Sequence, residues 1–250
     1  MRPLIGFATL CALFTFFGCG QDGSSSVAED PSTTPEAAAD PEVTCGVLSW
    51  PVAAMDGGVS GLVEEAEVEA ALADLRKEAP MDAPKEAPWI ALAAGTYGGR
   101  ELVVLGVGRW SSASGPGDGA QELTLERTDT GLDETSWGDC QLRIALPSGR
   151  TQVELTAPDK GVDGTTTTPT VMANERECVS GRDPVPFLGA PEIVETAETI
   201  TVTMSSESAT GHQNCVGNPS VPVTLELAEP IGDRELVDGG VWPPRPIEVA

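Results

Sequence analysis

The chain has 250 residues, of which 39 are Asp or Glu and 14 are Lys or Arg, and its formal net charge at pH 7 is −25. This balance argues against a nucleic-acid partner and against adhesion to anionic lipid through basic patches, because both need clustered cations. The acids are spread along the whole chain, which favours a solvated, repulsive surface over weak calcium binding or a cationic partner. We expect no cofactor and no metal.

Residues 1–18 predict an export signal. Arg2 gives a positive start, and Pro3–Phe17 is an apolar run without a charge. The run is shorter than the about 20 residues that a transmembrane helix needs, and it has the length of the apolar region of a signal peptide.

The end of this run predicts a lipid attachment site. Gly18 precedes Cys19, and this pair resembles the lipobox of bacterial lipoproteins, in which a small residue stands before the cysteine that receives a diacylglycerol. Phe16 and Phe17 depart from the lipobox pattern. An ordinary cleaved signal and an uncleaved anchor are the alternatives to a lipid on Cys19.

A polar segment follows the cysteine. Residues 20–44 are rich in Ser, Thr, Pro, Ala and acids and contain no aromatic residue, so they bury too little apolar surface to fold. We interpret residues 19–44 as the lipid cysteine and a disordered tether. The folded body after it is predicted to have two domains, 45–147 and 148–250.

The first domain is predicted to be α+β, with one helix and an antiparallel meander. A stripe of apolar residues at helical spacing predicts a helix over 64–79; the stripe comprises Val68, Ala71, Leu72, Leu75 and Ala79. Alternating and apolar runs predict four strands, at 89–94, 101–107, 121–127 and 141–146. Turns are expected at 96–99 and 129–133, and a loose loop at 111–119.

The second domain is predicted to be an all-β, sandwich-like domain. It has no helical pattern, and short strand patterns alternate with Gly, Pro, Asn and Asp, which is typical of a sandwich. The expected strands are 152–156, 169–174, 192–196, 199–204, 221–227 and 241–249.

Four cysteines downstream of Cys19 predict two disulfides, since an even number in an exported chain is typical of disulfide bonding. They allow three pairings. We favour Cys45–Cys140 and Cys178–Cys215, because each pair closes a loop inside one predicted domain. The chain has no Cys-x-x-Cys motif, which argues against redox catalysis and against cysteine zinc sites.

Two motifs for nucleophilic or nucleotide chemistry fail. His212, the sole histidine, lies in a polar stretch next to Cys215, so a Ser-His-Asp triad has little support. Ser60 lacks the second glycine of a nucleophile elbow. Gly106 and Gly108 follow a strand pattern, but Ser111 replaces the third glycine of a dinucleotide fingerprint. We predict no catalytic residue from these motifs, although paired carboxylates for hydrolysis stay open because their pairing is spatial.

The segment Asp159–Gly164 suggests a calcium loop and also fails. Gly161 and Thr170 stand where an EF-hand needs oxygen ligands. A turn with solvated acids is the favoured interpretation.

Two arginines are candidate anchors for structure or for an anionic ligand. Arg182 and Arg234 each adjoin an aspartate, and a guanidinium forms bidentate bonds with a carboxylate. Structural anchoring is the favoured role. The segment Trp242–Pro246 is either a partner-binding extended segment or a final strand packed by its tryptophan.

Three segments resemble a group of uncharacterised lipoproteins from high-GC Gram-positive bacteria: residues 137–140 (WGDC), 175–183 (ERECVSGRD) and 218–239. The resemblance covers most of residues 45–245. It implies an envelope location, a two-part body and two intradomain disulfides, and it implies no activity.

These observations lead to one expectation and two alternatives. We expect a lipoprotein that is held to the lipid bilayer through Cys19 on the outer face of the cell membrane, or at the outer membrane where the cell has one. Its body would be a non-enzymatic binding module with an envelope protein partner. The alternatives are a carboxylate-dependent hydrolase, with two facing acids of shifted pKa, and a small-ligand binding protein that uses an interdomain cleft.

Overall fold

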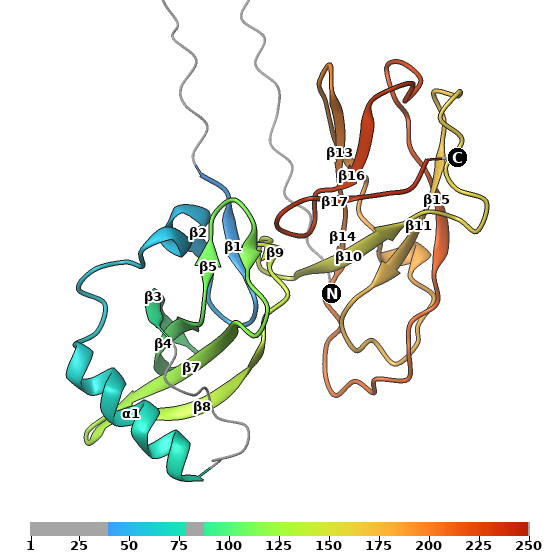
Figure 1. Cartoon of the computed structure of the whole chain (residues 1–250). Coiled ribbons are helices and arrows are strands. Elements are labelled where there is room, and N and C mark those ends of the chain that lie inside the picture. The colour runs from blue at the N-terminus through green and yellow to red at the C-terminus, as the bar shows by residue number, and fades with distance from the viewer. Residues whose placement is uncertain (1–39, 79–87, 250) are drawn as a thin grey trace, which may run out of the picture. The chain divides into compact units, whose positions relative to one another are not determined.

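The computed structural model describes residues 40–78 and 88–249 (Figure 1). Across these residues it contains one α-helix and several mostly antiparallel sheets. Residues 1–39, which include the predicted signal peptide, Cys19 and most of the predicted tether, lie outside the described residues. The described residues belong to one unit, Ala39–Ala250, and the predicted boundary at residues 147 and 148 stays a prediction.

The predicted helix and meander are present in the first part of the chain. The sheet has the order β3-β4-β7-β8, and its antiparallel strands are β3 (Trp89–Tyr97), β4 (Arg100–Val107), β7 (Gln121–Thr128) and β8 (Gly131–Asp139). Helix α1 (Glu65–Glu78) precedes them. Acids in its first turn and basic residues in its last turn suit the helix dipole.

The apolar stripe of α1 packs on one face of this sheet. Val68, Leu72 and Leu75 are buried in a cluster with Leu123 and Leu125 of β7. Each fully buried leucine contributes about 1.5–3 kcal/mol relative to an exposed one. Ala79, predicted to end the stripe, lies outside the described residues.

The prediction of the fourth meander strand was wrong in position. The strand is β8, which pairs with β7 from Thr128↔Gly131 to Gln121↔Asp139, whereas a strand was expected over 141–146. That segment holds the two-residue strand β9 (Arg143–Ile144), which pairs with β1 in a different sheet. Direct continuation from β7 through a short turn makes β8 the fourth strand of the meander, and the later segment pairs with β1 instead.

Strand β1 (Glu42–Thr44) lies in the predicted tether, so the folded body includes these residues. It pairs with β9 and with β2 (Trp50–Pro51). Val43 is fully buried and joins Trp50 and Met55 in a second apolar cluster. Val52 and Ala54 of the 3-10 helix Val52–Asp56, like Met55, belong to this cluster. Burial of these apolar side chains explains why the chain is ordered here in spite of its polar flank.

Glycines with positive φ occur at the β3–β4 turn and at the start of β6. Gly98 and Gly99, with φ of 60° and 80°, form the two-residue turn between β3 and β4, a conformation that glycine adopts without strain. Gly115, with φ of 72°, begins strand β6 (Gly115–Pro116), which pairs with β5 (Trp110–Ser111). A small hairpin therefore stands inside the expected loose loop.

The rest of the chain forms two four-stranded sheets. The order in the first is β14-β10-β11-β15 and in the second β12-β13-β16-β17. The strands of the first sheet are β10 (Arg150–Thr156), β11 (Thr170–Glu175), β14 (Ser205–Glu207) and β15 (Val221–Thr224). Those of the second sheet are β12 (Glu192–Glu195), β13 (Thr199–Thr203), β16 (Glu235–Asp238) and β17 (Arg245–Pro246). The 3-10 helix Val185–Phe187 lies between β11 and β12.

Both of these sheets contribute to one apolar core. Val153 of β10 and Val171 of β11 are buried with Ile200 of β13 and Leu236 of β16. The sequence did not predict β16, which pairs parallel with β13 and antiparallel with β17. The predicted strand over 241–249 is shorter than expected and is represented by β17.

A returning segment crosses to the first part of the chain before β17. The Trp242 backbone N–H donates to the Leu142 carbonyl at 3.1 Å, and the Ile144 N–H donates to the Gly240 carbonyl at 3.0 Å. The Trp242 indole N–H donates to the Ser112 carbonyl at 2.9 Å. Trp242 also packs against the cluster that holds Trp50, so the predicted packing by this tryptophan is present.

Candidate functional site

A cluster of charged side chains lies where β10 meets the end of β16. Glu154 comes from β10 and Arg176 follows β11, while Asp238 ends β16 and Arg245 begins β17. Antiparallel pairing sets Asp238 directly opposite Arg245. The sequence singled out Arg245 only as part of the segment Trp242–Pro246 and gave no signal for the other three residues. We call these four residues the Glu154 network.

Two guanidinium groups hold the Glu154 carboxylate. Arg245 donates to one oxygen at 2.6 Å, and Arg176 donates to the other at 2.6 Å. Burial acts to raise the pKa of Glu154, but these hydrogen bonds outweigh it and hold the pKa below its ordinary value. The side chain of Glu154 is 19% exposed, and both of its oxygens already accept a charged donor.

Asp238 is the buried member of the network. Its side chain has no exposed surface, and its two oxygens accept the backbone N–H groups of Leu155 at 3.1 Å and Gly240 at 2.9 Å. Arg245 stands 3.5 Å away. Burial raises the pKa of Asp238 in spite of the two backbone hydrogen bonds, which favour the charged form.

The pKa values of two acids, Glu154 and Asp238, are thus shifted in opposite directions, a pattern that also occurs in acid–base catalysis. Here two arginines balance two carboxylates. Neither carboxylate presents a free oxygen to solvent, because Glu154 is held by guanidinium groups and Asp238 is enclosed. This geometry is that of a structural ion-pair cluster that joins β10, β11, β16 and β17.

A shallow hollow adjoins the network. Arg176 also donates to the Gln141 side-chain carbonyl at 2.6 Å, and Gln141 and Arg245 line a hollow of about 360 Å³ together with Leu142, Trp242, Pro243 and Pro244. Pro243 and Pro244 are exposed, while Trp242 is partly buried. The hollow therefore combines apolar side chains, such as those of Leu142 and Pro243, with the Gln141 amide and the Arg245 guanidinium.

Arg182, one of the two predicted anchors, is engaged in the fold. Its guanidinium donates to both oxygens of Glu175, at 3.2 and 2.5 Å, and lies 3.8 Å from the centre of the Phe187 ring. The Glu175 side chain has no exposed surface and that of Arg182 is 18% exposed. Arg182 thus neutralises a buried carboxylate, which leaves it few directions for a ligand.

Arg234, the second predicted anchor, holds a turn. It donates to Glu195 at 2.8 Å and to the carbonyls of Glu229 and Pro230 at 3.0 and 2.9 Å. The predicted bidentate bond to a carboxylate is replaced here by one carboxylate oxygen and backbone carbonyls. These bonds fix the turn before β16 against β12.

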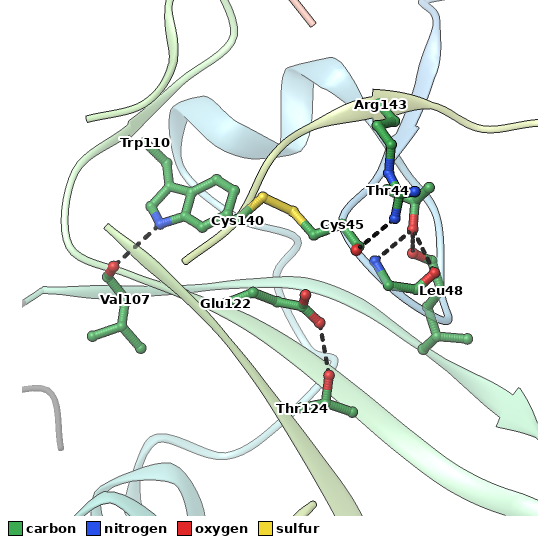
Figure 2. The surroundings of a disulfide bond; sticks show 10 residues. Thr44, Cys45, Leu48, Val107, Trp110, Glu122, Thr124, Cys140 and Arg143 are labelled. Carbon is green, nitrogen blue, oxygen red and sulfur yellow. Dashed lines mark hydrogen bonds between the residues drawn. A yellow bond between two sulfur atoms is a disulfide. The ribbon is translucent and has the colours of Figure 1, made fainter. Parts of the chain in front are cut away.

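The structure contains the two disulfides that the sequence favours, Cys45–Cys140 and Cys178–Cys215. Figure 2 shows Trp110, Glu122 and Arg143 around Cys45–Cys140. Arg143 donates to the Cys45 carbonyl at 3.1 Å, and both half-cystines pack against the cluster that contains Trp50. Disulfides of this kind indicate an oxidising, extracytoplasmic location.

The other motifs from the sequence lie apart from the Glu154 network. Ser60 is exposed in the turn before α1, and His212 is exposed in the loop before Cys215. Asp163 accepts the backbone N–H and hydroxyl of Thr165, and these bonds lower its pKa. A Cβ on Gly106 would stand 2.7 Å from the Trp110 ring, so close ring packing explains this glycine. The structure does not assemble these residues into one site.

Within residues 40–78 and 88–249, no group of three or more His, Cys, Asp or Glu side chains is arranged to hold a metal ion. In the same part of the chain, no helix has the length and apolar character to cross a membrane. Comparisons of the chain with protein-family models, with curated proteins and with solved structures give no match.

Proposed function

We propose that this chain is an exported lipoprotein, anchored through Cys19 on the outer face of the cell membrane, whose body is a non-enzymatic binding module for an envelope protein. In a cell with an outer membrane, that membrane is the proposed location. The observation that carries the proposal is the pair of disulfides, because such bonds persist in proteins exported from the cytosol. An apolar leader that ends at Gly18-Cys19 supports export with lipid attachment.

The arrangement of charged residues supports a binding role over catalysis. Arg182 and Arg234 hold carboxylates and carbonyls of the chain itself, and the Glu154 network is internally balanced. The resemblance to uncharacterised lipoproteins and the division into an α+β domain and a sandwich-like domain are part of the same proposal. Two apolar clusters that lie wholly on opposite sides of residues 147 and 148 support that division, while Trp242 packs across it against the cluster of Trp50.

A carboxylate-dependent hydrolase is the second candidate, favoured by the opposed pKa shifts of Glu154 and Asp238. Such an enzyme would have to release Glu154 from Arg176 and Arg245 before it could act. A small-ligand binding protein is the third candidate and would use the hollow at Gln141 and Arg245. In that case ligand binding would protect Arg245 from chemical modification.

Lipid attachment is tested by mass spectrometry of the N-terminal peptide from the protein made in its own host. We expect a diacylglycerol on Cys19, and the matched variant Cys19→Ser should lose both this mass and membrane association. An unmodified N-terminus at another residue would contradict the lipoprotein proposal.

The binding role is tested by crosslinking intact cells and capturing the tethered protein. One stoichiometric envelope protein is the expected result, with the Cys19→Ser variant as a control for membrane proximity. The protein would instead be a hydrolase if it turned over a sugar or ester substrate and if Glu154→Gln lost this activity while it kept the fold.

A further inference from the structure

The two disulfides differ in their surroundings. Cys178 and Cys215 are both exposed, whereas Cys45 and Cys140 are partly buried and pack against the apolar cluster of Trp50. Thiol–disulfide exchange needs in-line access of a thiolate to a sulfur atom, so exposed disulfides are the ones that reductants reach.

A hollow of about 210 Å³ opens at the exposed disulfide. Cys178 and Cys215 line it together with Glu177, Gly217 and Asn218. Val216, next to Cys215, is itself 70% exposed. A small thiol or the tip of a protein loop therefore has room to approach the sulfur atoms.

The apolar core does not depend on this disulfide. The core of the two four-stranded sheets is built from aliphatic side chains such as Val153, Val171 and Ile200 and includes neither Cys178 nor Cys215. Reduction would remove a constraint on the loops without opening a cavity in the core.

Hydrogen bonds hold the two loops together independently of the sulfur atoms. The Ser180 N–H donates to the Asn214 carbonyl at 3.0 Å, and the Asn214 N–H donates to the Ser180 hydroxyl at 3.0 Å. The Asn218 side chain donates to the carbonyls of Glu175 and Glu177, each at 2.6 Å. These bonds keep the two cysteine positions close after reduction, so the disulfide can form again between the same partners.

We propose that Cys178–Cys215 is a reversible thiol–disulfide exchange site that takes electrons from a dithiol, while Cys45–Cys140 remains oxidised as a structural link. A thiolate of the dithiol attacks one sulfur, the Sγ–Sγ bond breaks, and the released thiolate takes a proton from water. The second thiol of the reductant then resolves the mixed disulfide. The net result is two thiols on this chain and one disulfide in the reductant.

The test is a titration of the full chain with dithiothreitol. Free thiols are first blocked with N-ethylmaleimide, the protein is then equilibrated with reductant, and new thiols are alkylated and located by peptide mass spectrometry. We expect Cys178 and Cys215 to be labelled together at a dithiothreitol concentration about tenfold or more below that needed for Cys45 and Cys140. Labelling of Cys45 and Cys140 first, or of all four together, would overturn the proposal.

A second measurement separates exchange from unfolding. The partly reduced protein should keep its near-ultraviolet circular dichroism and should reform the 178–215 bond when the reductant is removed. The double variant Cys178→Ser/Cys215→Ser should lack the labelling at low dithiothreitol and keep the labelling at high dithiothreitol. The matched double variant Cys45→Ser/Cys140→Ser should show the reverse. Loss of the tertiary signal at the first step, or reoxidation to scrambled pairs, would refute a reversible site.

Discussion

The carboxylate of Asp238 accepts the backbone N–H of Leu155 at 3.1 Å, which ties the end of β16 to β10 in the neighbouring sheet. The same carboxylate accepts the Gly240 N–H at 2.9 Å and is fully buried. One side chain therefore satisfies two buried backbone donors that would otherwise lose their hydrogen bonds on folding. It also brings Arg245 toward Glu154, so the network depends on this link.

Asp238→Ala should lower the free energy of unfolding by about 2–4 kcal/mol, because it leaves two backbone N–H groups without an acceptor. Asp238→Asn should cost less, since its amide keeps one carbonyl oxygen. Urea unfolding followed by tryptophan fluorescence measures both. Asp233→Asn, at an exposed position in the preceding turn, is the control and should change stability by less than about 0.5 kcal/mol. Equal stability of Asp238→Ala and wild type would contradict the role of the link.

The lowered pKa of Glu154 predicts that stability falls as the pH is lowered through the acidic range. Its pKa in the folded protein is held below the ordinary 4.5, so its stabilisation is present above pH 4.5 and is lost as the pH falls through the folded value. As the pH is lowered, the urea midpoint of unfolding should therefore fall less steeply for Glu154→Gln than for wild type.

The pKa shift of Asp238 predicts the opposite dependence of stability on pH. Burial raises its pKa above the ordinary 3.8, so its contribution is most favourable below that value and is lost as the pH rises through the folded pKa. Asp238→Asn should thus remove a decrease in stability that wild type shows as the pH rises above 3.8. Identical pH profiles for both variants and wild type would show that the network does not titrate as described.

Arg182→Ala should destabilise the fold by about 3–5 kcal/mol, because it leaves the buried carboxylate of Glu175 without its cation. Glu175→Gln in the same chain should recover part of this loss, since a neutral amide costs less to bury. A double-mutant cycle from urea unfolding measures the coupling. Additive effects of the two substitutions would mean that the pair contributes no interaction energy.

Gly106→Ala should lower stability by about 1–3 kcal/mol, because its Cβ would meet the Trp110 ring at 2.7 Å and force the ring to move. Gly138→Ala, also in a strand of the same sheet but with no atom within 4 Å of the added carbon, is the matched control and should be close to neutral. Thermal unfolding and near-ultraviolet circular dichroism measure both effects. An unchanged tryptophan signal in Gly106→Ala would contradict the packing argument.

Some elements were predictable because their information is local. The spacing of Val68, Leu72 and Leu75 defines one helix face over a few turns. Glycines between two apolar runs predicted a hairpin turn over 96–99, and the structure shortens this turn to two residues because β3 extends to Tyr97. The two disulfides followed from an even number of cysteines and from loops closed inside each half of the body. The tether was placed too far into the body because a single buried valine, Val43, gives no periodic pattern.

Other elements were decided by pairing between distant segments. Strand β16 is four residues long and has a charged residue at each end, so its sequence gives no strand pattern. Its pairing with β13 and β17 makes it a strand. The fourth strand of the meander is β8 and not the expected strand over 141–146, because β8 follows β7 directly and pairs with it. This pairing is seen only in the assembled sheet.

The sequence by itself predicted the helix and most strands, because short-range periodicity encodes them, and it predicted the disulfide pairs from the number and positions of the cysteines. The leader before Cys19 stays a prediction from the sequence. The tertiary structure alone decided that Glu154 and Asp238 share Arg245, that Arg182 neutralises Glu175, and that one disulfide is exposed and the other is packed against a core. These outcomes depend on burial and on contacts between residues as far apart as 154 and 245. Desolvation and pairing change the energy of a charge far more than any neighbour in the chain does.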